Sequence, residues 1–231
     1  MLIQQNLQMH HILFPIIGTF IYTTCICRFN TTIKYIKTFA IFHNLFLALF
    51  SLYIFVYLCN ILYKKGIHYE SQYYLKMSTK TESDSLIYAF YLSKYYEYMD
   101  TFILKTQGKK TSFLQTFHHC GAVICWYLGY YYKVDTIVIA TFLNSGIHTM
   151  MYTYYLLTTM KCKVGFVKPL ITVCQILQLL VGNLSSLYYY YPPVESLFNY
   201  LIIIFMNIYV LILIGLFGNF YYKSYIKLKL D

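Results

Sequence analysis

The sequence predicts an all-α polytopic membrane protein with seven transmembrane helices. Hydrophobic residues make up 59% of the 231 residues and charged residues only 11%, and the mean hydropathy is +0.52. A soluble domain carries about a quarter charged residues, so this chain could not cover a water-facing surface. The apolar residues gather in seven segments, each near the ~20 residues that cross a bilayer. They form a single integral membrane domain over residues 1–231.

Each predicted span is an apolar run between polar or turn-forming residues. The first is the weakest, because Pro15 and Gly18 interrupt it. It also lacks the basic stretch that begins a cleaved signal peptide. Pro192 and Pro193 mark the turn before the last span. The seven spans cover residues 11–28, 39–63, 86–104, 112–132, 136–158, 166–188 and 197–222.

The formal net charge of +10 reflects 18 lysines and arginines, which lie mostly in loops. Most of them fall in loops 29–38, 105–111 and 159–168 and in the C-terminal tail, all on one side of the predicted membrane. Positive residues gather on the cytosolic side, which places the N-terminus in the lumen and the C-terminus in the cytosol. The same charge suits anionic substrates at this face, and no nucleic-acid partner is expected.

The C-terminal tail carries a lysine pattern of its own. Lys227 and Lys229 occupy the fifth and third positions from the end. On a cytosolic tail, this KxKxx pattern is a retrieval signal for the endoplasmic reticulum. The alternative is a pair of ordinary interfacial lysines, but the predicted side of the tail agrees with retrieval.

The third span carries ionisable residues, which are expensive in hydrocarbon and mark functional positions. Lys94 and Glu97 are three residues apart, so their side chains can pair within the bundle. Such a pair either serves a reaction or holds neighbouring helices in register. Asp100 lies near the cytosolic end, where it can orient a histidine of the next span.

Two adjacent histidines lie in the first two turns of the fourth span. His118 and His119 follow Gln115 by three and four residues, so the three side chains can share a face. Free backbone N–H groups at a helix start suit a thioester oxyanion or a phosphate of coenzyme A. Together with a third histidine on the next span, the pair indicates an enzyme site inside the membrane.

The fifth and sixth spans each present a polar stripe. Asn144, His148, Met151 and Tyr152 follow helical spacing and face the bundle interior. Either Tyr152 or Asn144 can fix the tautomer of His148. The stripe of the sixth span either bonds neighbouring helices or lines a substrate tunnel, and its members are Thr172, Gln175 and Gln178.

No metal site is expected. The seven cysteines lie mostly within apolar runs and form no CxxC pair, so we interpret them as small apolar residues. Of the seven histidines, only three fall in the candidate site, which makes iron hard to coordinate.

Taken together, these motifs resemble the ELO family, the very-long-chain fatty acid elongases or 3-oxoacyl-CoA synthases of the endoplasmic reticulum. The resemblance covers about residues 39–229 and rests on four linked motifs in the right order and spacing. They are Lys94-x-x-Glu97-x-x-Asp100-Thr101, Phe113-Leu114-Gln115-Thr116-Phe117-His118-His119, Asn144-x-x-x-His148-x-x-Met151-Tyr152-x-Tyr154-Tyr155 and Thr172-x-x-Gln175-x-x-Gln178.

One position departs from the family pattern. The family box usually reads HxxHH, and here its first position is Gln115. A glutamine cannot act as a base, but it can still donate or accept a hydrogen bond. We interpret this box as a variant of an active enzyme.

The resemblance implies that the last six of the seven transmembrane helices surround a narrow substrate tunnel open to the cytosol. It implies condensation of a long-chain acyl-CoA with malonyl-CoA, which gives a 3-oxoacyl-CoA two carbons longer and releases CO2 and CoA. This is the first step of fatty acid elongation. Acyl-CoA and malonyl-CoA would be substrates, with no further cofactor. Membrane lipid, the 3-oxoacyl-CoA reductase and other elongation-cycle enzymes would be partners.

The resemblance also suggests roles for the candidate residues. His118 would attack the acyl-CoA and form an acyl-imidazole, because imidazole can accept an acyl group. His119, held by Asp100 or Glu97, would stabilise charge, and His148 would face His118 and position malonyl-CoA. The remaining candidates are the catalytic-site Lys94, the substrate-binding Gln115, Asn144, Tyr152, Gln175 and Gln178, and the phosphate-binding lysines at 105, 109, 110, 161, 163 and 168.

Two other classes of protein fit parts of the pattern. A membrane di-iron desaturase or hydroxylase also uses histidine boxes, and stoichiometric iron in the purified protein would identify it. A seven-span lipid transporter or receptor needs no such residues, and a transporter would move substrate without releasing the free thiol of CoA.

Overall fold

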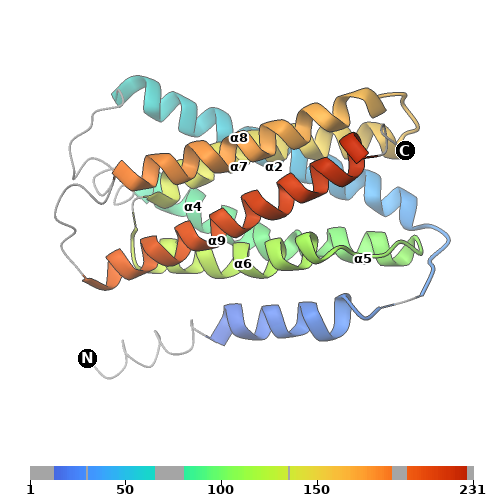
Figure 1. Cartoon of the computed structure of the whole chain (residues 1–231), viewed down its shortest axis with the longest axis horizontal. Coiled ribbons are helices and arrows are strands. Elements are labelled where there is room, and N and C mark those ends of the chain that lie inside the picture. Colours follow the sequence, from blue (N-terminus) through green and yellow to red (C-terminus); the bar gives the residue numbers. More distant parts are fainter. Residues whose placement is uncertain (1–12, 30, 66–80, 135, 189–196, 228–231) are drawn as a thin grey trace.

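The computed structural model of the chain describes residues 13–29, 31–65, 81–134, 136–188 and 197–227 (Figure 1). Within these residues the fold is all-helical, as predicted. A helix over residues 13–21 continues into a π-helical turn at Tyr22–Ile26. The main helices are α2 (Ile36–Lys65), α4 (Thr81–Tyr96), α5 (Tyr98–Thr106), α6 (Phe113–Tyr131), α7 (Thr136–Thr159), α8 (Lys168–Tyr188) and α9 (Leu197–Tyr221).

Three of the described helical stretches are long and apolar enough to cross a membrane. They are Ile36–Tyr63, Gly165–Leu187 and Leu197–Ile226, and the apolar helix Leu13–Ile26 is shorter. Large apolar side chains on these stretches remain exposed, such as Phe42 at 66% and Leu184 at 64%. In water such a surface would be unfavourable, whereas lipid tails match it. The protein is therefore a multi-pass membrane protein.

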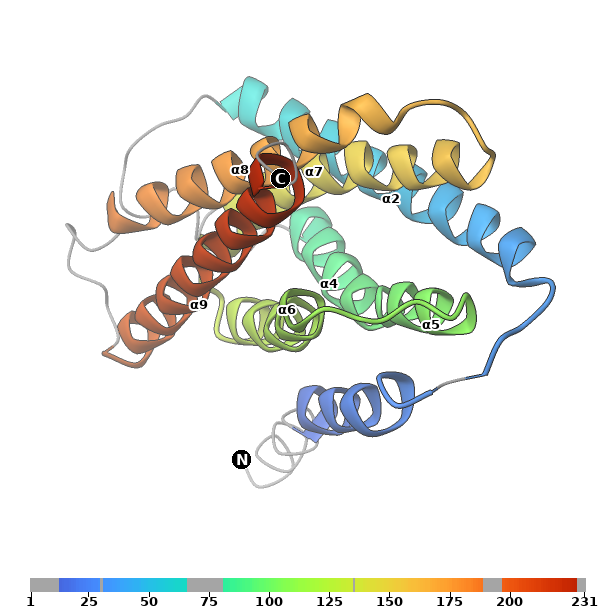
Figure 2. The same ribbon diagram turned by 45° about the vertical axis from the view of Figure 1, so that its right-hand side comes forward.

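The segment predicted as the third span, residues 86–104, lies in two consecutive helices. α4 ends at Tyr96 and α5 begins at Tyr98, with Glu97 between them. The N–H of Asp100 donates to the Glu97 carbonyl at 3.0 Å, so the chain tightens into a turn of the 3₁₀ type. Figure 2 shows the accompanying change of direction between α4 and α5. Beside this turn, Glu97 contacts His148 on α7, whereas Asp100 contacts both His43 on α2 and Tyr152 on α7.

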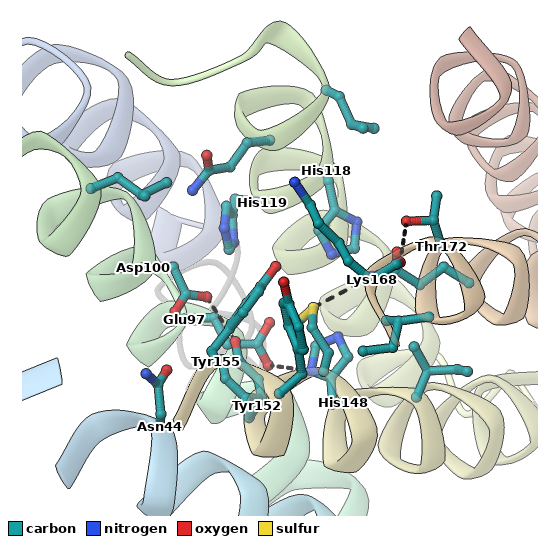
Figure 3. Close-up of a pocket in the computed structure, with 18 of the residues that line it drawn as sticks. Asn44, Glu97, Asp100, His118, His119, His148, Tyr152, Tyr155, Lys168 and Thr172 are labelled. Atoms are coloured by element: carbon teal, nitrogen blue, oxygen red, sulfur yellow. Dashed lines mark hydrogen bonds and ion pairs between the residues drawn. The ribbon is translucent and has the colours of Figure 1, made fainter. Parts of the chain in front are cut away.

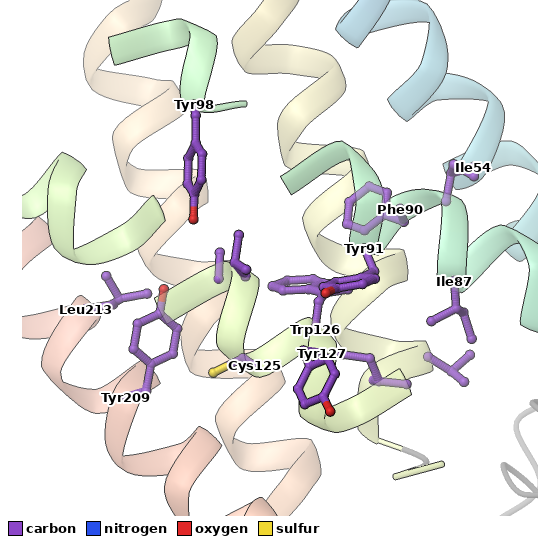
Figure 4. Close-up of a cluster of buried hydrophobic side chains, with 14 of the residues drawn as sticks. Ile54, Ile87, Phe90, Tyr91, Tyr98, Cys125, Trp126, Tyr127, Tyr209 and Leu213 are labelled. Atoms are coloured by element: carbon purple, nitrogen blue, oxygen red, sulfur yellow. The ribbon is translucent and has the colours of Figure 1, made fainter. Parts of the chain in front are cut away.

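The helices pack around α7. The most extensive helix contact joins α2 to α7, α8 packs against both α7 and α9, and α4 packs against α6. Buried aromatic side chains fill the space between α4 and α6 (Figure 4). Among them, Trp126 on α6 donates its indole N–H to Thr141 on α7 at 3.1 Å, which links this cluster to the central helix.

The first helical segment docks beside α4 and α5 and lies outside the remaining helices (Figure 2). Gly18 lets it approach closely, because an added Cβ would lie 2.4 Å from Cε1 of Tyr95. Further along, Tyr22 is fully buried. Its ring stacks on Tyr98 with centroids 4.2 Å apart, and its hydroxyl lies 2.8 Å from the Thr101 hydroxyl. The first segment, whose sequence signal was the weakest, is thus held by close packing at Gly18 and by the buried hydrogen bond of Tyr22 to Thr101.

Gly18→Val should undock this first segment. We expect a loss of about 1–3 kcal/mol, because the new side chain would overlap the Tyr95 ring. Thermal unfolding of the detergent-solubilised protein measures it. Gly215→Val is the matched control, since an added Cβ there meets nothing within 4 Å. Equal stability of the two variants would contradict the close approach of the first segment.

Candidate active site

A cavity of about 520 Å³ lies among α2, α5, α6, α7, α8 and α9. Its wall includes Lys109, in the turn between α5 and α6, and Lys168, the first residue of α8, at the end of the bundle with the predicted basic loops. Farther along the helices, the wall includes His118, His119 and His148. Figure 3 shows the Lys168 side chain extending across the cavity in the direction of the two α6 histidines. A single chamber therefore connects the basic end of the bundle with the histidines.

The three predicted histidines come together in this wall from two helices. His118 and His119 lie near the start of α6, and their ring centroids are 5.6 Å apart. α6 begins where the Ser112 hydroxyl accepts the N–H of Gln115 at 3.1 Å, which is a helix N-cap. His148 projects from α7, and both His119 and His148 are more than nine-tenths buried.

The predicted ion pair is present and completely buried. Nζ of Lys94 lies 2.7 Å from Oε1 of Glu97, and the two side chains are 1% and 2% exposed. Lys94 also donates to Oδ1 of Asn144 at 2.9 Å, and its Nζ lies 4.0 Å from the ring centroid of Phe90. Glu97 lines the cavity, but Lys94 is absent from the wall. Lys94 therefore lies behind Glu97 as seen from the cavity, and its part in the reaction stays a prediction.

The partner of His148 differs from the prediction. Tyr152 and Asn144 do not fix its tautomer, because Tyr152 donates to Asp100 and the Asn144 oxygen accepts from Lys94. Instead, Nδ1 of His148 lies 3.3 Å from Oε1 of Glu97, as an ion-pair contact rather than an aligned hydrogen bond. Glu97 is therefore the group that faces this ring nitrogen.

The prediction that Asp100 or Glu97 holds His119 was also wrong. Oδ1 of Asp100 lies 2.8 Å from Nε2 of His43 on α2, and Oδ2 accepts the Tyr152 hydroxyl at 2.7 Å. Both oxygens are thus occupied by other helices. Nδ1 of His119 has no hydrogen-bond partner among the described residues, and its ring makes an edge contact with the Tyr22 ring at 5.6 Å.

His43 is the member of this network that sequence reasoning missed. Its side chain is 1% exposed, and its Nδ1 has no partner among the described residues. Because Nε2 faces a carboxylate, the ring donates its proton there. The signal was present in the sequence, since an imidazole inside a predicted span marks a candidate position in the same way as His148 does.

Gln115, the variant position of the box, joins α6 to α5. Its Nε2 donates to the hydroxyl of Thr101 at 3.0 Å, the same hydroxyl that contacts Tyr22. Gln115 also lines the cavity. Its amide therefore acts as a hydrogen-bonding link between two helices and the first segment.

The polar stripe of α8 faces the cavity. Thr172, Gln175 and Gln178 all contribute to the wall of this cavity. Gln175 also contacts Sδ of Met151 through its Nε2 at 3.4 Å. Asn144 and Tyr152 line the same wall from α7.

The predicted lysine cluster is only partly at the cavity. Lys109 lines the wall, whereas Lys105 and Lys110 do not. The α5–α6 turn includes Gly108 in the left-handed region, with a φ of +73°. Of the lysines between 161 and 168, Lys168 lines the wall. The retrieval pattern cannot be placed, because Lys229 lies outside the described residues.

The cysteines are all unpaired. Cys120 directly follows His119 in α6, but it is absent from the cavity wall. Within the part of the chain that the structure describes, no three His, Cys, Asp or Glu side chains are grouped so that they could hold a metal ion.

Comparison with known proteins places the chain among fatty acid elongases. The GNS1/SUR4 (ELO) family profile matches residues 7–230, which extends the resemblance beyond the predicted residues 39–229. Fatty acid elongase sre1 of Dictyostelium discoideum is 32% identical over 92% of this chain and 83% of its own length. Fatty acid elongase A of the same organism is 31% identical over 94% of this chain and 84% of its own length.

Similarity extends to vertebrates. Very long chain fatty acid elongase 5 of Xenopus tropicalis is 31% identical over 80% of this chain. The match spans 64% of the Xenopus protein, so that relative contains further sequence.

Lys94→Met should destabilise the protein by about 3–5 kcal/mol, because it leaves the Glu97 carboxylate buried without its cation. Thermal unfolding in detergent measures the loss. The double variant Lys94→Met with Glu97→Gln removes both charges, and it should recover part of that stability. If the double variant loses the sum of the two single losses, the pair is not energetically coupled and our interpretation of its role fails.

Proposed function

The chain belongs to the ELO (GNS1/SUR4) family and is a fatty acid elongase, and we propose that the cavity between α6, α7 and α8 is where it condenses acyl-CoA with malonyl-CoA. This acyltransferase reaction gives a 3-oxoacyl-CoA two carbons longer and releases CO2 and CoA. The observation that carries the proposal is the meeting of His118, His119 and His148 in one wall of a chamber that also reaches the basic end. Family membership does not favour the desaturase or the transporter.

We propose seven membrane spans, with the last six around a tunnel. The position of the first segment outside the other helices supports this arrangement (Figure 2). α2, α6 and α8 begin, and α5, α7 and α9 end, beside the predicted basic loops and tail. This common end is the proposed cytosolic face, in a single domain of the endoplasmic reticulum membrane with a luminal N-terminus. The 3-oxoacyl-CoA reductase and other enzymes of the cycle are proposed partners at that face.

The size of the chamber supports binding of an acyl chain. Ligand pockets occupy about 300–1,000 Å³, and this one measures about 520 Å³. Apolar residues such as Leu179 and Ile147 contribute to its wall beside the glutamines of α8. Each buried methylene of the tail would contribute about 0.8 kcal/mol. The tail therefore anchors the substrate while the thioester stays near the histidines.

The first chemical step in this proposal is acyl transfer to His118. The lone pair of a ring nitrogen attacks the thioester carbonyl, the C–S bond breaks, and the sulfur leaves with the bonding electrons. CoA thiolate then takes a proton from water. His119, the adjacent imidazole on α6, is proposed to stabilise the oxyanion that develops during attack.

The second step joins the acyl group to malonyl-CoA. Loss of CO2 leaves an electron pair on the α-carbon of an enolate, which attacks the acyl carbonyl and returns the C–N electrons to His118. His148, whose ring faces Glu97 at 3.3 Å, is proposed to position the malonyl thioester. Asp100 and Glu97 hold the surrounding helices, and no cofactor enters either step.

His118→Ala should abolish condensation, lowering the rate on the order of 10³-fold, because the acyl acceptor is lost. Extension of a long-chain acyl-CoA with labelled malonyl-CoA, in microsomes containing matched amounts of each variant, measures the rate. Cys120→Ala is the control and should retain parental activity, since Cys120 does not line the cavity. An active His118→Ala beside an inactive Cys120→Ala would overturn the imidazole nucleophile in favour of a thiolate.

Lys109→Ala and Lys168→Ala should each raise the KM for acyl-CoA roughly three- to ten-fold. Both lysines line the cavity at the basic end of the bundle, where they would attract the CoA phosphates. The effect should shrink as ionic strength rises. Lys110→Ala, outside the cavity wall, provides the comparison. If the KM shifts equally in all three variants, a phosphate site at Lys109 and Lys168 is ruled out.

A further inference from the structure

We propose that Tyr209 on α9 is a positioning residue for His118, which keeps the ring proton on Nδ1 and leaves the Nε2 lone pair free to attack the acyl thioester. The proposal rests on the proposed role of His118 as acyl acceptor. Tyr209 does not line the cavity, so it acts through the histidine and does not touch substrate.

The Tyr209 hydroxyl makes two contacts with the same residue. It donates to the main-chain carbonyl of His118 at 2.9 Å, and its oxygen lies 3.5 Å from Nδ1 of that ring. A phenol has one proton, and the carbonyl can only accept. The hydroxyl therefore has only lone pairs to offer to Nδ1, which selects the tautomer with hydrogen on Nδ1. Such contacts are often long without substrate and shorten when it binds.

The ring of Tyr209 is held in place by α6 itself. Its Cε2 would lie 2.0 Å from a Cβ added at Gly121, and its centroid lies 5.4 Å from that of Phe117. The residue is 8% exposed. Figure 4 shows the Tyr209 ring extending from α9 toward α6. Because Gly121 is one turn after His118, the glycine makes room for the ring where its hydroxyl can reach the histidine.

This arrangement removes the need for a proton transfer at His118. When Nε2 forms its bond to the acyl carbon, Nδ1 keeps its hydrogen and the product is an acyl-imidazolium. The departing CoA thiolate takes its proton from water. Attack by the enolate then breaks the N–C bond and returns the neutral ring with Nδ1 still protonated. An acyl-imidazolium is a stronger acyl donor than the neutral acyl-imidazole, so the retained proton favours the second step.

Tyr209→Phe tests the proposal, because it removes the hydroxyl and leaves the ring. The full-length variant is mixed with a long-chain acyl-CoA without malonyl-CoA, and the first turnover of CoA release is followed as free thiol. Steady-state kcat and KM are then measured with both substrates. We expect acylation and kcat to fall about 10- to 100-fold, the size of effect seen when a metal-bound histidine loses the group that orients it, with little change in the KM for acyl-CoA.

Gly121→Ala is the second variant, since it keeps the hydroxyl but displaces the ring, and it should also slow acylation. Tyr222→Phe, which changes an exposed tyrosine after α9, should match the parent.

All rates are expressed per folded molecule. An acylation rate of Tyr209→Phe equal to that of the parent overturns the proposal, and so does a loss confined to the yield of folded protein. If Tyr209→Phe does not fold, a parental rate in Gly121→Ala overturns it. Normal acylation of His118→Ala would instead overturn the proposed function.

Discussion

The buried ion pair between Lys94 and Glu97 is the constraint on which the site depends. Taking two charges out of water costs several kcal/mol per ion, so the pair persists only because each charge is well surrounded. Lys94 is contacted by Asn144 and by the ring face of Phe90, and Glu97 faces His148. The turn between α4 and α5, the register of α7 and the direction of a histidine are therefore coupled through one electrostatic contact.

α7 connects this pair to a second polar network. Asn144 and His148 face the ion pair, while Tyr152 one turn later donates to Asp100. The other oxygen of Asp100 binds His43 on α2, the helix with the most extensive packing against α7. Sliding α7 along α2 would break contacts in both networks at once. This part of the cavity wall is thus fixed, and α6 presents its histidines to a rigid surface.

Local features of the site could be predicted from sequence, because they depend on helical spacing. The pairing of Lys94 with Glu97 and the inward stripe of α8 follow from residues three apart. The features that sequence reasoning missed depend on which helices meet. Asp100 binds α2 and α7 rather than His119, and no periodicity indicates that choice. The helix break at Glu97 was not predicted for a different reason, because the residues on both sides of it lie in helices.

The Lys94–Glu97 ion pair and the contacts of Asp100 can form at different times during synthesis of the chain. Lys94 and Glu97 lie three residues apart, so they can neutralise each other while their segment first enters the lipid, where one charge at a helix centre costs about 2.5–3.5 kcal/mol. Asp100 instead contacts side chains from distant parts of the chain, His43 and Tyr152. His43 has already emerged from the ribosome, whereas Tyr152 follows 52 residues later. Asp100 therefore completes its contacts only after Tyr152 on α7 has been synthesised.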